Sequence, residues 1–253
     1  MPKLRVSGRE YEVDGILFDK DGTLLEFLPL WGRWAEFLTD QVAEAIRSIG
    51  GFPVPLEVKR EWLGLDMNEH GRITGYDLGG PLSMASIPEI EGILAWQLYK
   101  QGLPWNEAIA KIRIFRMRAT KYIEHERPVF PVQGLQGFLS QCNELNVPLG
   151  VVTADQTDEA VKHLSWMGIS GFFKTIMGSD LVSEGKPSTE IIYKACGELG
   201  TAPERTALIG DTSGDMQMGQ GAGMAVTIGL SRDGSILHGA KEMITTYEAL
   251  VIN

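Results

Sequence analysis

Cysteine is scarce in this sequence. Only Cys142 and Cys196 occur among its 253 residues, and they lie far apart without CxxC spacing. A disulfide framework and a cysteine-based zinc site are therefore not expected, and both thiols should be free and buried. The histidines lack the spacing of metal ligands as well, so we expect surface positions for all four. They are His70, His125, His163 and His238.

The sequence is equally short of positive charge and of long apolar runs. It has 23 Lys and Arg against 33 Asp and Glu, a formal net charge of -10. This balance argues against a general nucleic-acid-binding protein, which needs a basic face to displace counterions. No run approaches the ~18 apolar residues of a membrane span, and residues 1–15 lack a signal-peptide core. We therefore expect a cytoplasmic protein with no nucleic-acid or membrane partner.

What is present at both ends of the chain is an alternation of strand and helix signals. Residues 4–6 and 11–13 could form a small hairpin. Short apolar runs then predict parallel strands, separated in the second half by apolar positions at helical spacing. The strands are expected at residues 16–18, 148–152, 175–177, 207–209 and 225–228. This alternation predicts an α/β fold with a Rossmann-like, doubly wound parallel sheet covered by helices on both faces.

The region between the first two strands has helical signals alone. Apolar spacing predicts helices over about 31–49, 88–101 and 106–124. The glycine-rich segment 70–86 between the first two of them reads as a loop. We expect no strand in this region.

Acidic residues stand where buried strands end. In GILFDKDGTLLEF, at residues 15–27, Asp19 and Asp21 follow the first strand, and in LIGDTSGDM Asp211 ends another strand with Asp215 four residues on. Ligands of parallel α/β sheets bind beyond these carboxyl ends. Several carboxylates at one place would repel each other unless a cation joined them, and oxygen ligands favour Mg²⁺.

Donors for a phosphate occur at the same edge of the predicted sheet. Thr153 ends the strand PLGVV and offers its hydroxyl, with the backbone amides of Ala154 and Asp155 beside it. Lys186, in SEGKPSTE, precedes a predicted helix and could bring its ammonium group over the strand ends. Together with the carboxylates, these groups favour phosphoryl transfer through an aspartyl phosphate.

Four short motifs follow one another along the chain. They are DKDGT at 19–23, Thr153 after an apolar strand, Lys186 in GKPSTE, and GDTSGD at 210–215. Over residues 15–229 this order resembles the haloacid dehalogenase superfamily, specifically its phosphoglycolate-phosphatase-like branch. The resemblance implies a Rossmann-like catalytic core from residues 1–24 and 129–253. It implies an all-helical cap domain, residues 25–128, inserted after the first core strand.

The resemblance also implies a role for each motif residue. Asp19 would be the nucleophile, and Asp21 the acid that protonates the leaving oxygen and then the base for water. Thr153, Ala154 through its backbone amide, and Lys186 would hold the phosphate. Mg²⁺ would be bound by the Asp19 carboxylate, the Asp21 backbone carbonyl and Asp211, with Asp215 inside or just outside the coordination sphere.

Lys20 and Ala154 depart from the usual pattern of that superfamily. Lys20 stands where its members usually have an apolar residue, and strand alternation favours a solvated side chain that points away from Asp19 and Asp21. Ala154 lacks the side-chain donor of many members but keeps the backbone amide. The second aspartate weighs against a dehalogenase or a phosphonoacetaldehyde hydrolase, and not against a phosphomutase.

Several side chains of the expected cap are candidate specificity determinants. Trp31 and Trp34 fall on the apolar stripe of a predicted helix, so core packing is favoured over a role in lining the substrate site. Arg33 lies off that stripe and is a better candidate. The cations of KIRIFRMRATK, residues 111–121, are more typical of a solvated helix face than of a substrate-binding surface.

These observations together predict an Mg²⁺-dependent phosphatase. Its substrate would be a small phosphorylated metabolite, a phosphomonoester such as phosphoglycolate or a sugar phosphate, and the protein a monomer or homodimer. One alternative is a sugar phosphomutase of the same superfamily. A second is a catalytically idle binding protein on the same fold.

Overall fold

The chain forms two compact units in the computed structural model, which describes residues 2–232 and 234–253. Met1–Glu26 and Val129–Asn253 make up the first, and Phe27–Pro128 make up the second. We call them the core unit and the inserted unit. In the described residues no helix combines the length and the apolarity that crossing a bilayer would need.

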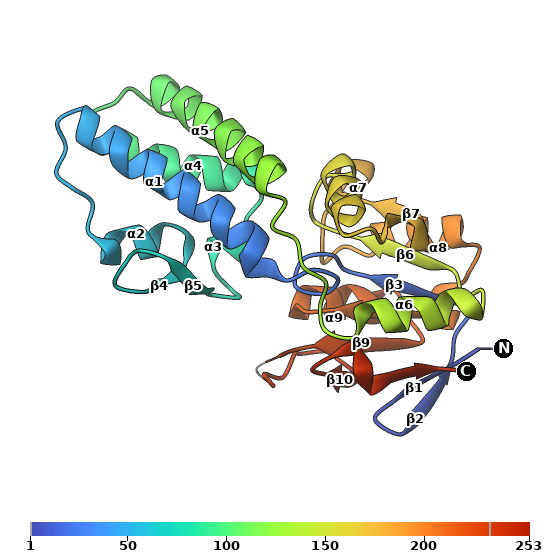
Figure 1. Cartoon of the computed structure of the whole chain (residues 1–253). Helices are drawn as coiled ribbons and strands as arrows, with labels where there is room; N and C mark the ends of the chain where they lie inside the picture. The colour runs from blue at the N-terminus through green and yellow to red at the C-terminus, as the bar shows by residue number, and fades with distance from the viewer. Residues whose placement is uncertain (1, 233) are drawn as a thin grey trace. The chain divides into compact units, whose positions relative to one another are not determined.

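A six-stranded sheet forms the centre of the core unit (Figure 1). All neighbouring strands in it are parallel. Its order is β10 (Glu242–Ile244), β9 (Val226–Leu230), β8 (Thr206–Gly210), β3 (Gly15–Phe18), β6 (Leu149–Val152) and β7 (Phe173–Met177). Because β3 lies between β8 and β6, the carboxyl ends of these three strands leave the sheet side by side.

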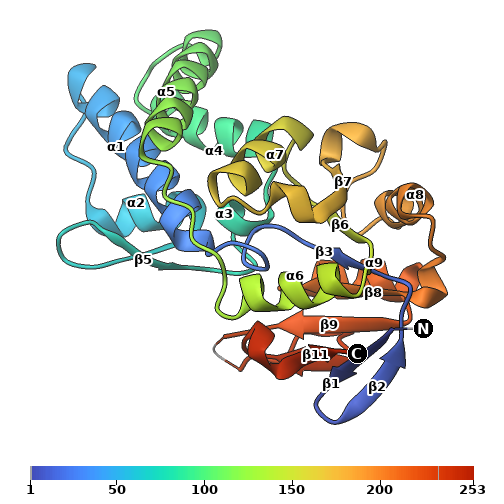
Figure 2. The same ribbon diagram turned by 45° about the vertical axis from the view of Figure 1, so that its right-hand side comes forward.

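Helices cover both faces of this sheet (Figure 2). Alternate residues of β3 point to opposite faces. Ile16 and Phe18 pack into one apolar cluster with α6 (Leu135–Glu144) and α7 (Thr157–Trp166). Leu17 packs into another with α8 (Glu190–Leu199) and α9 (Ser213–Gly221). The predicted doubly wound α/β core is confirmed.

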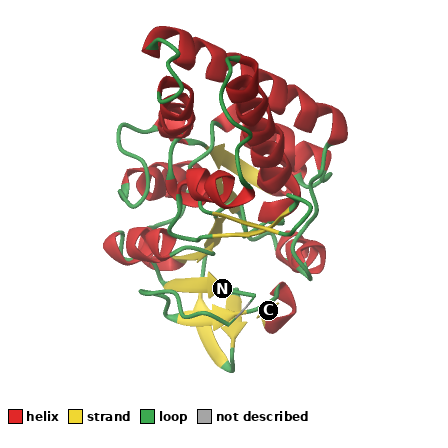
Figure 3. Cartoon of the chain, turned by 90° about the vertical axis from the view of Figure 1, so that its left-hand side faces the viewer, coloured by secondary structure: helices red, strands yellow, loops and turns green. Residues whose placement is uncertain are grey.

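A second, small sheet joins the two ends of the chain (Figure 3). The predicted hairpin is present as β1 (Lys3–Val6) and β2 (Arg9–Glu12), and β11 (Leu250–Ile252) pairs antiparallel with β1. Lys3 and Asn253 exchange backbone hydrogen bonds of 2.9 and 3.0 Å. Short helical turns complete the core unit at η2 (Ser170–Phe172), η3 (Ser179–Leu181), η4 (Pro203–Arg205) and η5 (Tyr247–Ala249).

Three long helices of the inserted unit were predicted and are present. They are α1 (Arg33–Ser48), α4 (Ile87–Tyr99) and α5 (Trp105–Glu126). Three shorter helical segments were not predicted: η1 (Leu28–Gly32), α2 (Leu56–Leu63) and α3 (Pro81–Met84). Trp34 is buried in α1 as expected, whereas Trp31 lies in η1 and is only partly buried.

The prediction that this inserted region is all-helical is wrong. The strands β4 (Leu65–Met67) and β5 (Ile73–Tyr76) form an antiparallel hairpin, and β5 lies inside the glycine-rich segment expected as a loop. Strand β5 is held by a contact from outside the glycine-rich segment, because the ring of its residue Tyr76 stacks on Phe27 with a centroid distance of 4.2 Å. Local sequence could not reveal such a strand, because tertiary packing stabilises it.

Candidate active site

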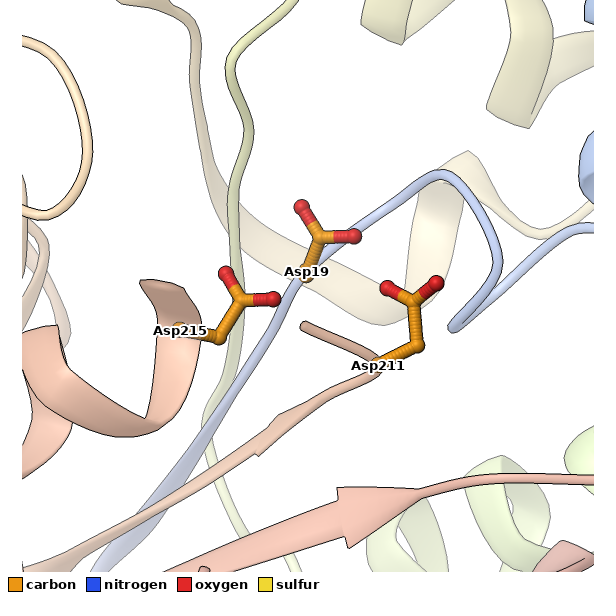
Figure 4. A group of neighbouring side chains, drawn as sticks. All are labelled: Asp19, Asp211 and Asp215. Carbon is orange, nitrogen blue, oxygen red and sulfur yellow. The ribbon is translucent and has the colours of Figure 1, made fainter. Parts of the chain in front are cut away.

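Three carboxylates meet at the carboxyl edge of the central sheet. Asp19 follows β3, Asp211 follows β8, and Asp215 lies in the first turn of α9. One oxygen of each side chain lies within 4.8 Å of the corresponding oxygens of the other two. Figure 4 shows the three side chains directed toward a common space. The sheet order explains this, because β3 and β8 are parallel neighbours.

Lys186 joins two of these carboxylates. Its Nζ donates to Asp19 Oδ1 at 2.5 Å and to Asp215 Oδ1 at 2.6 Å. Burial lowers the pKa of the ammonium group, but the two carboxylates outweigh that effect and the pKa is raised. Lys186 is therefore held as a cation at this site.

One ammonium group does not balance the negative charge of the cluster. Burial is the main reason that the pKa of Asp19 is raised to about 6, with Lys186 opposing the shift and Asp215 and Asp21 adding to it. Burial, followed by Asp19 and Asp215, raises the pKa of Asp211 well above its usual range. These carboxylates need a further cation to ionise together. Their hard oxygen donors fit a divalent ion such as Mg²⁺.

The turn after β3 positions Asp211. Thr23 Oγ1 donates to Asp211 Oδ1 at 3.2 Å, and Tyr247 Oη donates to the Thr23 carbonyl at 3.2 Å. Gly22 has a φ of +83°, and a Cβ there would lie 2.6 Å from Asp211 Cγ. Both the backbone conformation and the close approach of the carboxylate require glycine at this position.

The N-terminus of α9 fixes Asp215. Thr212 is the N-cap residue, and its Oγ1 accepts from the Asp215 amide at 3.1 Å while donating to Asp215 Oδ2 at 2.5 Å. The Thr212 amide also donates to Oδ2 at 3.1 Å. Both oxygens of Asp215 are thus held, Oδ2 by the helix cap and Oδ1 by Lys186.

Thr153 and Ala154 follow β6, the other neighbour of β3. The buried Thr153 Oγ1 accepts from the Asp155 amide at 3.1 Å, which leaves its own O–H as a donor. Among the described residues nothing accepts a hydrogen bond from the Ala154 amide, and this residue is exposed. Both groups offer donors at the carboxyl end of β6, which is next to β3 in the sheet.

The prediction that Lys20 is solvated and points away from Asp21 is wrong. Its side chain is 0% exposed, and its Nζ lies 2.7 Å from both carboxylate oxygens of Asp21. Strand alternation fails here because the chain turns directly after β3, with the Leu24 amide donating to the Lys20 carbonyl at 2.8 Å. The ammonium group also lies 3.3 Å from Asp155 Oδ2 and 3.2 Å from His163 Nδ1.

The profile of one protein family, described as haloacid dehalogenase-like hydrolase, matches residues 73–228. This chain belongs to that family. Phosphoglycolate phosphatase of Chromobacterium violaceum is 25% identical to it over 213 residues, 84% of this chain and 83% of that protein. Pyrophosphatase PpaX of Halalkalibacterium halodurans is 31% identical over 134 residues, 50% of this chain and 62% of that relative's length.

The haloacid dehalogenase-like fold recurs in solved structures. A Thermotoga maritima protein assigned as a β-phosphoglucomutase has a TM-score of 0.65 and 17% identity, over 93% of this chain and 95% of that one. At this identity the likeness concerns the fold alone. The resemblance inferred from the four motifs is confirmed, and the phosphoglycolate phosphatases among the relatives agree with the predicted branch.

Four of the predicted residues lie together in this haloacid dehalogenase-like site: Asp19, Lys186, Asp211 and Asp215. The Asp21 side chain, predicted as the acid and base, contacts Lys20 instead, and its backbone carbonyl remains a predicted metal ligand. Thr153 lies on the neighbouring strand end. Lys20 was missed as a site residue, although its place between two site aspartates was visible in the sequence.

Two further expectations concern histidines and cap cations. His70, His125 and His238 are exposed as predicted, but His163 is buried on α7. Several cations of the inserted unit form ion pairs within that unit. Arg113 and Arg116 of α5 pair with Glu91 of α4 at 3.4 and 2.7 Å, and Arg33 lies 3.9 Å from Glu126.

Proposed function

We propose that this protein is an Mg²⁺-dependent phosphatase that hydrolyses a small phosphomonoester through an aspartyl phosphate on Asp19. One observation carries the proposal: Asp19 contacts Lys186 in a cluster with the partly buried Asp211 and the buried Asp215. A nucleophilic carboxylate, a fixed cation and an unbalanced group of oxygen ligands are the components that phosphoryl transfer needs.

In the first half-reaction, Asp19 Oδ2 attacks the phosphorus atom. Oδ1 is held by Lys186 at 2.5 Å, which orients the other oxygen. As the new O–P bond forms, the ester O–P bond breaks, and Asp21 gives its proton to the leaving oxygen. Lys186, the Thr153 hydroxyl and the Ala154 amide would bind the phosphate oxygens.

In the second half-reaction, water attacks the phosphorus atom of the aspartyl phosphate. Asp21 takes the proton of that water, the Asp19 O–P bond breaks, and inorganic phosphate leaves with both aspartates restored. Asp19, Asp211, Asp215 and the Asp21 carbonyl would hold the metal ion. A bound Mg²⁺ would neutralise the carboxylates and the phosphate charge that they face.

The relatives support a substrate class. Phosphoglycolate phosphatases align over most of the chain, which makes phosphoglycolate or a sugar phosphate the proposed substrate. A sugar phosphomutase of the same superfamily is the second candidate, because the set of Asp19, Asp21 and Lys186 serves either reaction and a protein assigned as a β-phosphoglucomutase shares the fold. In a mutase the aspartyl phosphate passes to a second sugar hydroxyl before water reaches it.

Phosphate release from a panel of small esters with Mg²⁺ tests the function. The panel should include phosphoglycolate, sugar phosphates, pyrophosphate and p-nitrophenyl phosphate. Asp19→Asn keeps the shape of the side chain and removes the nucleophile, so turnover should fall by on the order of 10³-fold or more. Undiminished hydrolysis by this variant would contradict the mechanism.

Two control experiments separate the alternatives. Incubation with glucose 1-phosphate would identify a mutase if an isomerised product formed without free phosphate. Absence of any Mg²⁺-dependent activity across the whole panel would instead support a binding protein on the same fold.

A further inference from the structure

A second cluster of charged and polar side chains includes Asp21, the proposed acid and base. It consists of Lys20, Asp21, Asp155 and His163, which come from the loop after β3, the loop after β6 and helix α7. The Lys20 ammonium is the shared partner. It lies 2.7 Å from Asp21, 3.2 Å from His163 Nδ1 and 3.3 Å from Asp155 Oδ2.

The ammonium group of Lys20 contacts groups from three segments of the chain. It donates to Asp21 Oδ1 at 2.7 Å and lies 3.2 Å from His163 Nδ1, and it pairs with Asp155 Oδ2 at 3.3 Å by charge, without a hydrogen bond to that oxygen. The side chain of Lys20 is fully buried, and the carboxylates of Asp21 and Asp155 lie close enough to balance a positive charge on it.

Asp155 and His163 are themselves held in place. Asp155 Oδ1 accepts from the Gln156 amide at 2.8 Å, at the start of α7. Burial, with Lys20 next to the ring, lowers the pKa of His163 to about 3 and keeps the imidazole neutral. To accept from Lys20, Nδ1 must be unprotonated, which assigns the ring proton to Nε2, 3.9 Å from Glu159 Oε2.

A contribution to the stability of the fold is a poor explanation for this cluster. Apolar side chains of similar volume can often replace a buried ion pair without loss of stability, so a buried ion pair is weak evidence that its residues serve folding. Lys20 precedes Asp21 directly and follows the nucleophile Asp19 directly. Its place points to control of the side chain that performs proton transfer.

We propose that Lys20 is a positioning residue for Asp21, and that Asp155 and His163 anchor it. This inference rests on the proposed phosphatase function. The ammonium fixes the Asp21 carboxyl group, which on the loop after β3 would otherwise sample several rotamers. Both oxygens of Asp21 lie 2.7 Å from the ammonium group, so general acid catalysis requires one of them to turn to the leaving group while the other keeps the contact. Misplacement of the carboxyl group should therefore damage general acid catalysis first.

The test is the leaving-group dependence of kcat/KM for Lys20→Met. This constant reports the step that forms the aspartyl phosphate. An alkyl phosphate such as glycerol phosphate needs the proton on its leaving oxygen, whereas p-nitrophenolate leaves with little assistance. We expect a loss of about 10- to 100-fold for the alkyl ester and only a few-fold for p-nitrophenyl phosphate.

Lys59→Met is the matched control. Lys59 is also a buried lysine in an ion pair, with Asp40 of the inserted unit. Its replacement should leave the ratio of alkyl to aryl kcat/KM as in the wild type. His163→Leu, which removes one anchor, should shift the ratio in the same direction as Lys20→Met, and His163→Gln, which keeps an acceptor, should restore it in part.

The outcomes separate this proposal from the function on which it rests. Equal losses for both esters in the Lys20 variant and in the His163 variants would overturn the positioning role while the phosphatase function stands. If Lys20→Met does not fold, the two His163 variants decide by the same ratio. A wild-type protein inactive toward every ester would overturn the function and the positioning role together.

Discussion

At Gly22 the site depends on the absence of a side chain. Its φ of +83° disfavours other residues, and a Cβ would overlap the Asp211 carboxylate. We expect Gly22→Ala to cost about 1–2 kcal/mol from the backbone conformation. Displacement of Asp211 should in addition reduce Mg²⁺-dependent turnover by at least about 100-fold.

Gly8→Ala is the matched control for that substitution. Gly8 has nearly the same φ, +82°, but a Cβ there has no neighbour within 4 Å. It should show the backbone cost alone in chemical unfolding and retain full activity. If Gly22→Ala retained full activity as well, the contact with Asp211 would have no role in the site.

Single residues also show where sequence reasoning reaches its limit. The motif residues could be chosen from their types and their places at strand ends. The partners of Lys20 could not, because His163 is 143 positions away in the sequence and α7 brings it close. A surface position was therefore expected for a histidine that is in fact buried.

At the scale of elements, the start of α9 links helix stability to the site. Thr212 caps the helix and holds Asp215 Oδ2 through its hydroxyl and its amide. Thr212→Val should cost about 1 kcal/mol in the free energy of unfolding. Because Asp215 then loses a fixing contact, Mg²⁺ affinity should fall by about 10-fold or more, measured by calorimetric titration.

The inserted unit offers a control for this helix-capping effect. Ser86 and Glu89 form a capping box at the start of α4. Ser86→Ala should lower stability by a similar amount and leave Mg²⁺ affinity unchanged. An unchanged Mg²⁺ affinity in Thr212→Val would show that the cap stabilises the helix and has no role in the site. Thr212→Ser keeps the hydroxyl group and should behave as the wild type.

Elements were predictable where their pattern is local. The helices α1, α4 and α5 show apolar spacing over three or more turns, and the five predicted core strands are short apolar runs. The strands β4, β10 and β11 have three residues each. β4 and β10 each include an acidic residue, so neither shows an apolar run, and these short strands exist because a partner strand is present.

At the scale of the whole molecule, the buried negative charge should couple stability to Mg²⁺ and to pH. In the metal-free protein the pKa of Asp19, about 6, lies above the ordinary value of 3.8. The folded state therefore binds this proton more tightly than the unfolded state. Its stability should fall as the pH rises from about 4 to about 6, and stay lower above that range.

Mg²⁺ should reverse this loss at the higher pH. At 100 times its Kd, one bound ion adds about 2.7 kcal/mol, which raises the Tm of a chain of this length by roughly 5 to 10 °C. The rise should be present at about pH 7.5 and clearly smaller at about pH 5, where protons compete for the carboxylates. Thermal unfolding with and without Mg²⁺ at each pH measures the rise in Tm that the ion causes. Titrating groups that do not bind the ion affect both measurements equally, so their effect cancels in the difference.

Asp211→Asn is the control for that measurement. It removes one negative charge, so the metal-free variant should be more stable than the wild type at about pH 7.5 and should lose most of the Mg²⁺ effect. An Mg²⁺-induced rise of equal size in the variant would place the ion elsewhere.

The sequence by itself determined the α/β core and the carboxylate site. Parallel strands end at one edge of a sheet, so residues that follow β3, β6 and β8 must lie near one another wherever they stand in the chain. Only the tertiary structure decided the surroundings of Lys20 and the hairpin of the inserted unit. Both depend on contacts between segments distant in sequence, and such contacts leave no local pattern to read.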